Sequence, residues 1–303
     1  MNQFTPLKGR GSLIERATEI YDFNAALRGR AAPAVDLAAG PATEPVAPVF
    51  PAQSDGFRAP DWRGPMQPLD RIALAEGGFL LPDGPVTALS EEFRLLKRDL
   101  LSQLQGAKRG NRILVCSAHS GEGKSFCAIN LALSLAAEQD RQVLLVDADF
   151  GKPGLPGKLG LEGGPGLMDA LADPAIAIED IVIRTDLPTL GVLPAGQRSN
   201  TDTEYLASAR TEQLLDRLTA ERPERIIVFD SPPLLAASAA AVLASHAAVA
   251  LLVVRADVTP ESAVREAAGM LKGGAQVQLL LNGVRFRGGV RRFAGYYHQG
   301  DDR

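Results

Sequence analysis

Residues 117–125, with the sequence SAHSGEGKS, form a glycine-rich loop of the kind that binds phosphate. Glycines allow backbone N–H groups to close around phosphate oxygens, and a helix that begins there adds the positive end of its dipole. Lys124 would reach the β- and γ-phosphates, and the Ser125 hydroxyl would bind Mg²⁺. The alternative interpretation is a glycine-rich turn with a solvated lysine. The predicted nucleotide-binding residues of this stretch are Gly121, Glu122, Gly123, Lys124, Ser125 and Phe126.

Three aspartates, Asp147, Asp149 and Asp230, follow two apolar runs further along the chain. Phosphoryl transfer depends on charge neutralisation and positioning, and proteins hold Mg²⁺ with few carboxylates and several waters. The aspartates would hold Mg²⁺ directly or through water, and one of them would accept a proton from an attacking hydroxyl. For a single aspartate at a strand end, the alternative is a helix cap. The predicted catalytic residues are Lys124, Asp147, Asp149 and Asp230, and the predicted metal ligands are Ser125, Asp149 and Asp230.

The segments that must position these residues alternate between apolar strands and helices. The run at 113–116 precedes the loop, and apolar residues recur with helical spacing after it. Further strands are predicted at 142–149, 187–194, 225–233, 247–255 and 277–284, and helices at 164–172, 176–182, 203–221, 236–246 and 260–272. This order predicts an α/β domain with a doubly wound, mostly parallel sheet. Ligands bind to such sheets at the carboxyl ends of the strands, where the loop and the aspartates lie.

The N-terminal part of the chain differs in composition from the rest. Residues 13–27 have the spacing of a short amphipathic helix, either a marginal helix or a docking segment for a partner groove. Residues 28–82, rich in proline and alanine, would bury too little surface to order, which predicts a disordered, semi-extended linker in which Trp62 and Phe79-Leu80-Leu81 could contact the domain. We therefore expect an arm at 1–82 and a nucleotide-binding domain at 83–287, whose first helix is capped by Ser90.

The overall composition excludes several classes of protein. The formal net charge is −4, which argues against a nucleic-acid partner. The two cysteines have no spacing pattern, and buried thiols of this kind are typical of a reducing compartment. No apolar run approaches the roughly 18–20 residues of a membrane span, and the N-terminus has no signal-peptide core. We therefore expect a cytoplasmic protein.

Several motifs together resemble those of bacterial tyrosine kinases, in the MinD/ParA-like branch of P-loop ATPases. They are GEGKS, LLVDAD and IIVFDSPP, with EEFRLLK before them and LPAG at 193–196. The resemblance covers about 80–295 and is strongest to the exosortase-associated tyrosine autokinases, whose SLIERA phrase occurs at 12–17. The chain departs from these patterns at four positions: Ala118 replaces the first loop Gly, His119 the MinD/ParA lysine, Ser120 the usual Pro and Gly151 the usual Arg.

The resemblance implies an enzyme that uses ATP and Mg²⁺ to phosphorylate its own tail in trans, within a ring of subunits. The substrates would be Tyr296 and Tyr297, in a flexible segment at 288–303. The cytoplasmic tail of a membrane polysaccharide co-polymerase would activate it at the inner face of the membrane and so regulate exopolysaccharide polymerisation or export. By the same analogy Asp147 would be the base, Asp149 and Asp230 would arrange the Mg²⁺ shell, Asn282 would read adenine, and Glu91 and Arg94 would make subunit contacts.

A second hypothesis fits the same loop. A MinD/ParA-like ATPase switch, with no kinase activity, would bind a partner in its ATP state. The tail separates the two hypotheses, because a switch does not need adjacent exposed tyrosines.

Overall fold

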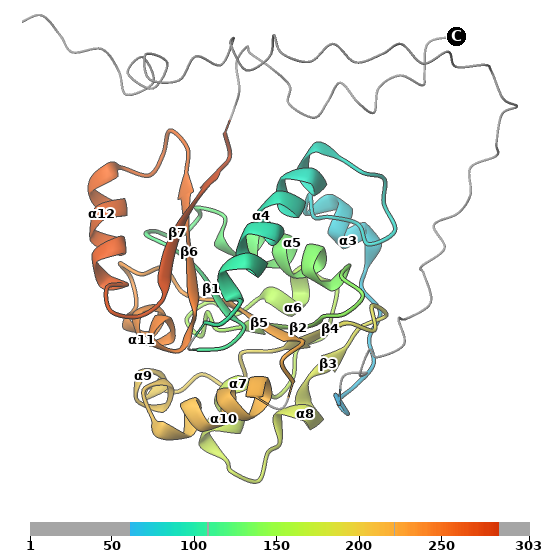
Figure 1. The fold of residues 1–303 in the computed structure, drawn as a ribbon. Coiled ribbons are helices and arrows are strands. Elements are labelled where there is room, and N and C mark those ends of the chain that lie inside the picture. Colours follow the sequence, from blue (N-terminus) through green and yellow to red (C-terminus); the bar gives the residue numbers. More distant parts are fainter. Residues whose placement is uncertain (1–60, 108, 221, 285–303) are drawn as a thin grey trace, which may run out of the picture. The chain divides into compact units, whose positions relative to one another are not determined.

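The protein is represented by a computed structural model that describes residues 61–107, 109–220 and 222–284. Within these residues a seven-stranded sheet is flanked by helices on both faces (Figure 1). The strands are β1 Arg112–Ser117, β2 Gln142–Asp147, β3 Ile183–Arg184, β4 Leu190–Leu193, β5 Arg225–Asp230, β6 Val249–Arg255 and β7 Gln276–Asn282. The helices are α3 Arg71–Glu76, α4 Ala88–Leu104, α5 Lys124–Ala136, α6 Leu155–Lys158, α7 Leu167–Ala172, α8 Ile178–Ile181, α9 Asp202–Leu206, α10 Ala209–Ala220, α11 Ser238–His246 and α12 Glu261–Met270.

The strand order is β3-β4-β2-β5-β1-β6-β7, and every pairing is parallel except that of β3 with β4. The central strand β1 lies between β5 and β6, and β2 lies on the other side of β5. The predicted doubly wound, mostly parallel sheet is therefore confirmed. Strands β1 and β2 flank β5 and all three run parallel, so their carboxyl ends lie together at the same end of the sheet.

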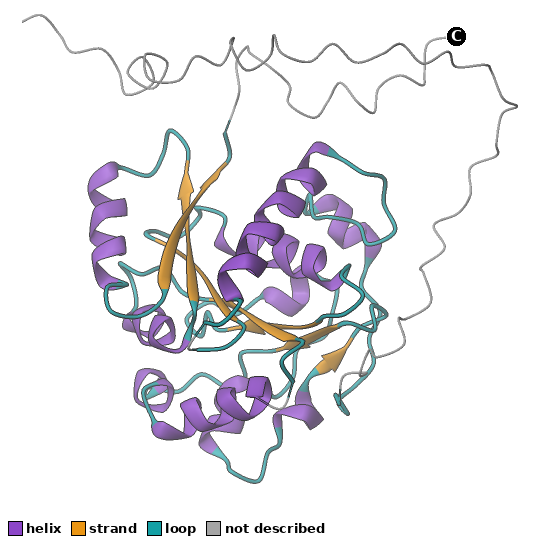
Figure 2. Cartoon of the chain, viewed as in Figure 1, coloured by secondary structure: helices purple, strands orange, loops and turns teal. Residues whose placement is uncertain are grey.

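Alternating residues of each central strand pack into two separate cores, as expected for a sheet buried on both faces. One core joins Leu114, Leu144 and Phe229 to residues of α7, α9, α10, α11 and α12. The other joins Ile113 and Val143 to residues of α3, α4 and α5. Figure 2 shows the helices on the two sides of the sheet. Strands β1, β2 and β5 are buried at every position, so the site at their ends rests on a well-packed framework.

Residues 61–82 correct the predicted extent of the linker, because they pack against the sheet. Trp62 is 6% exposed and its ring lies 4.0 Å from the buried guanidinium of Arg225. Leu74 in α3 is fully buried, and the Asp70 side chain caps that helix. Average composition misses this because a few apolar anchors, separated by prolines and glycines, are enough to order the segment. We call residues 61–82 the N-terminal strap.

Two helices also differ from their predicted limits. Helix α4 begins at Ala88 with Thr87 as its cap, because Thr87 and Ser90 exchange hydrogen bonds in a capping box and Ser90 lies inside the first turn. The helix predicted at 203–221 is split into α9 and α10, since the Ser208 and Thr211 hydroxyls both donate to the carbonyl of Tyr205 at the junction.

Some expectations concern residues that the structure does not describe. The amphipathic segment 13–27 and the tail 288–303, with Tyr296 and Tyr297, lie outside the described residues. In the part that is described, no helix is long and apolar enough to cross a membrane.

Candidate nucleotide site

The loop between β1 and α5 has the backbone geometry of a phosphate-binding loop. Gly121 and Gly123 have φ angles of 83° and 97°, in a region that side chains disfavour. A Cβ on Gly123 would also lie 2.0 Å from Nδ2 of Asn282, so a side chain there would displace the Asn282 amide as well as strain the backbone. The following residue, Lys124, begins helix α5, whose first N–H groups face the loop. The predicted strand, loop and helix are all present.

Lys124 forms a buried ion pair with Asp149. Its Nζ lies 2.9 Å from Asp149 Oδ2, and the two residues are each 8% exposed. The other oxygen of Asp149 accepts from the backbone N–H of Lys152 at 3.2 Å. The buried charge of Lys124 is therefore balanced by Asp149, in the position where a bound phosphate would balance it.

Asp147, at the end of β2, is held by backbone N–H groups. Its Oδ2 accepts from Gly154 and Leu155 at 2.9 and 3.0 Å, and its Oδ1 accepts from Asp149 at 3.2 Å. Burial raises the pKa of this carboxyl, and the three backbone hydrogen bonds oppose that effect. Two of these bonds come from Gly154, the N-cap residue of α6, and Leu155, its first residue, so Asp147 also holds the start of that short helix from outside it.

Asp230, at the end of β5, has an oxygen without a partner. It is 2% exposed, and its Oδ1 makes no hydrogen bond. Asp230 pairs in register with Asp147 on the neighbouring strand. Burial raises the pKa of Asp230 to about 7, although hydrogen bonding by the Ser125 side chain and the charge of Lys124 lower it. A buried carboxylate oxygen without a partner is costly and points to a ligand.

Glu122 braces the loop from within, a role that sequence analysis did not assign to it. It is 3% exposed; its Oε2 accepts from the backbone N–H of His119 at 2.9 Å and its Oε1 from the Thr259 hydroxyl at 2.5 Å. Arg255 donates to the Gly121 carbonyl at 2.7 Å. Arg255 and Thr259 lie at the end of β6 and in the next loop, and no motif marks them in the sequence. Only the parallel pairing of β1 with β6 reveals them.

The remaining predicted site residues lie near the loop in different ways. Asn282 donates to the Glu122 carbonyl at 2.9 Å, so its amide is already engaged with the loop backbone. The ring of Phe126 stacks on Phe79 of the strap at 5.6 Å, which leaves only its backbone for phosphate. Glu91 and Arg94 form an ion pair on α4, and Arg94 remains 49% exposed at its side chain.

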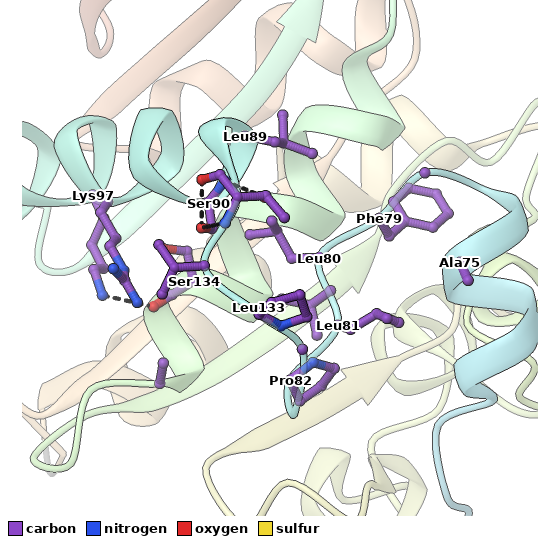
Figure 3. A pocket seen from close by; sticks show the side chains of 17 residues that line it. Ala75, Phe79, Leu80, Leu81, Pro82, Leu89, Ser90, Lys97, Leu133 and Ser134 are labelled. Atoms are coloured by element: carbon purple, nitrogen blue, oxygen red, sulfur yellow. Dashed lines mark hydrogen bonds between the residues drawn. The ribbon is translucent and has the colours of Figure 1, made fainter. Parts of the chain in front are cut away.

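A pocket of about 430 Å³ lies apart from these catalytic candidates (Figure 3). It is formed by residues 78–87, the first turns of α4 and the end of α5, and Arg94 and Lys97 line it. Lys97 already has partners. Its Nζ donates to the Ser134 carbonyl in α5 at 2.9 Å and forms an ion pair with Glu138, just after that helix, at 2.5 Å. None of the predicted catalytic residues lines this pocket, so we do not assign chemistry to it.

The fold and the loop together define a P-loop NTPase. In agreement, the family model described as the ParA NUBPL iron-transfer P-loop NTPase matches residues 108–184. Tyrosine-protein kinase YwqD of Bacillus subtilis is 30% identical over 60% of this chain and 75% of its own length. The kinase domain of VpsO is 30% identical over 65% of this chain and 96% of that domain, with a TM-score of 0.56. The chain belongs to the family of bacterial tyrosine-protein kinases.

Longer relatives match only in part. EpsB of Ralstonia nicotianae, named as a candidate tyrosine-protein kinase, is 34% identical over 63% of this chain, which spans 25% of EpsB. Tyrosine-protein kinase wzc of Salmonella typhi is 29% identical over 73% of this chain and 30% of its own length. The chain thus spans about a quarter of the length of EpsB, a relative that it matches.

Proposed function

We propose that this chain is an ATP-dependent protein-tyrosine autokinase that phosphorylates Tyr296 and Tyr297 of another copy of itself. The observation that carries the proposal is the buried Lys124–Asp149 ion pair beside the unpartnered oxygen of Asp230. This arrangement suits a ligand that brings both negative phosphates and a cation. Membership of the tyrosine-kinase family supports a tyrosine hydroxyl as the acceptor.

The residues present fit Mg²⁺ together with a nucleotide. Among the described residues, no group of three or more His, Cys, Asp or Glu side chains is placed to hold a metal alone. A magnesium ion would therefore depend on the Ser125 hydroxyl, on Asp230 and Asp149 directly or through water, and on phosphate oxygens. The unpartnered Asp230 oxygen would then gain a partner. When bound, Mg²⁺ neutralises charge that develops on the phosphates.

In the proposed reaction, the chain contributes position, charge and a proton acceptor. Lys124 would leave Asp149 and donate to the β- and γ-phosphates, while the loop N–H groups hold the same oxygens. Asp147 Oδ1 accepts only one backbone hydrogen bond, so a lone pair remains for the hydroxyl proton of an incoming tyrosine. Burial, which raises the pKa of Asp147, makes it a better proton acceptor.

Magnesium affinity should depend on pH through Asp230. Its pKa of about 7 means that protons compete with the cation below that pH, so apparent Mg²⁺ affinity should fall up to about tenfold per pH unit. It should level off above pH 7. Asp230→Asn should weaken Mg²⁺ binding most above pH 7, where the wild-type carboxylate is charged, and should remove most of the slope below it. Titrations of Mg²⁺ against bound fluorescent nucleotide measure both effects.

The sign of the stability change gives an independent check on the same carboxyl. In the metal-free protein the folded state keeps a proton on Asp230 between its ordinary pKa of 3.8 and about 7, whereas the unfolded state does not. Stability from this group is therefore lost as pH rises through that range. Asp230→Asn should flatten this part of the profile in urea unfolding, and an unchanged profile would contradict the assignment.

The proposed partners act through surfaces other than the loop. Glu91 and Arg94 form an ion pair on α4, and a neighbouring subunit would contact this pair in a ring through the half-exposed Arg94 side chain. The cytoplasmic tail of a membrane polysaccharide co-polymerase would activate the enzyme and bring it to the inner face of the membrane. The process regulated would be exopolysaccharide polymerisation or export, as the motif resemblance implies, and association with an exosortase system remains a prediction.

The tyrosines decide between the kinase and the ATPase switch. With Mg-ATP and the activator tail, the Tyr296→Phe/Tyr297→Phe variant should hydrolyse ATP at the normal rate and lose nearly all phosphotyrosine, because no acceptor hydroxyl remains in the tail. Phosphopeptide mapping and intact mass measure the loss, and Tyr205→Phe is the matched control. Phosphotyrosine at the wild-type level in the double variant, or mainly on Tyr21 or Tyr205, would contradict the proposal and favour the switch.

A further inference from the structure

The last strand of the sheet leaves apolar side chains in solvent. Val277, Leu279 and Leu281 alternate along β7 and are 37%, 60% and 58% exposed. Leu279 pairs in register with Leu252 of β6, so these side chains share the sheet face on which Leu252 is fully buried with residues of α11 and α12. The helical cover of this face therefore ends between β6 and β7.

The same strand is an edge of the sheet. β7 pairs with β6 on one side, and no strand of the described part pairs with the other. A free edge carries unpaired N–H and C=O groups, which proteins usually cover because other chains can add to them. An added strand would satisfy the edge and also cover the apolar side chains.

The chain has a suitable segment directly after β7. Residues 284–293 have the sequence VRFRGGVRRF, in which two runs with apolar residues are separated by a Gly-Gly pair. Two-residue glycine loops between such runs are typical of β-hairpins. A turn there would direct the following residues back along β7 and bring the pair Tyr296-Tyr297 beside Leu281. The short connection favours this segment over a second chain, because it keeps the local concentration high.

We propose that residues 290–300 add to the free edge of β7 in the same subunit as an antiparallel strand, which places Tyr296, His298 and Gly300 beside Leu281, Leu279 and Val277 and covers these three apolar side chains. The tail then has a resting place on its own subunit. Tyrosines held there are withheld from the nucleotide site of any other subunit, so docking would restrain phosphorylation in trans. This consequence rests on the proposed function, whereas the docking itself does not.

Trypsin tests the docking without nucleotide, on the full chain. Trypsin can cleave the tail after four arginines, Arg285, Arg287, Arg291 and Arg292. Intact mass measures how fast the peptide beyond each of them is released. Cleavage after the last two should be on the order of tenfold faster in Leu279→Glu/Leu281→Glu than in the wild type, because docking is lost. The matched control is Ile72→Glu, at a residue 71% exposed on α3, which should be cleaved like the wild type.

A tail variant keeps the test valid if the leucine variant does not fold. Val290→Asp/Phe293→Asp leaves β7 intact and should speed hydrogen exchange at the β7 amides. Equal tail cleavage in the wild type and the leucine variant, or unchanged exchange in the tail variant, would overturn the proposal. Protection that grows with protein concentration would show that a second copy occupies the edge and would also overturn it. Docking without autophosphorylation would refute the proposed function alone.

Discussion

Lys124→Ala should reduce nucleotide affinity and phosphotyrosine formation by on the order of 100-fold or more, because one charged donor aimed at transferring phosphate has an effect of that size. Titration with fluorescent nucleotide and the rate of autophosphorylation with activator measure the two losses. Lys158→Ala, which removes a lysine outside the loop at the end of α6, is the matched control and should behave like the wild type. Normal autophosphorylation in Lys124→Ala would rule out the loop as the phosphate site.

The ion pair complicates this variant in a way that a second variant resolves. Removing Lys124 leaves Asp149 as a buried carboxylate without its cation, which itself destabilises the fold. Lys124→Met combined with Asp149→Asn removes both charges and should recover most of that stability. It should not recover nucleotide binding. Urea unfolding and nucleotide titration on the same samples thus separate a folding defect from a binding defect.

The second large effect concerns the N-terminal strap. A chain that begins at Asp61 should fold and bind nucleotide like the full chain, whereas one that begins at Asp83 should fail to fold. The shorter chain loses buried Trp62, Leu69 and Leu74. Losses of about 2–5 kcal/mol for each large buried side chain would together exhaust a typical stability of about 5–15 kcal/mol. Soluble expression and circular dichroism of the two chains check this.

A point variant gives the same test without truncation. Trp62→Ala should lower the free energy of unfolding by about 3–5 kcal/mol, because it leaves a cavity and removes the ring over Arg225. Ile72→Ala, on the exposed side of α3, should change it by less than about 0.5 kcal/mol. Trp62 is the only tryptophan, so circular dichroism must follow unfolding in its variants. An effect of Trp62→Ala as small as that of Ile72→Ala would show that the strap is not part of the core.

The sequence allowed the central part of the site to be predicted because local patterns encode it. The loop motif lies between a strand and a helix that can each be recognised alone, and Asp147 and Asp230 lie at the ends of strands that prove to be neighbours. What was missed depends on contacts between distant residues. Thr259 reaches Glu122 only because β6 lies beside β1, and no local pattern contains that information.

The prediction that residues 61–82 belong to a disordered linker failed for the same reason, because contacts with distant residues order them. The prolines of the N-terminal strap lower its average tendency to order, but Trp62 packs in a site formed by residues distant in the sequence. A Cβ on Gly191 of β4 would lie 2.8 Å from the indole Nε1, so the ring packs there only because that residue is glycine. Arg225, from β5, supplies the other contact. The composition of residues 61–82 alone cannot predict this packing, because it depends on residues of β4 and β5.

The position of β1 also affects how the site forms during synthesis. Val115 of β1 pairs with Asp230 on one side and with Leu251 on the other, and both partners lie far along the chain. Pairings between such distant segments form slowly, since a long loop must close before any contact is gained. A nascent chain that ends before β6 therefore contains the complete phosphate-binding sequence but lacks a strand that holds it in place.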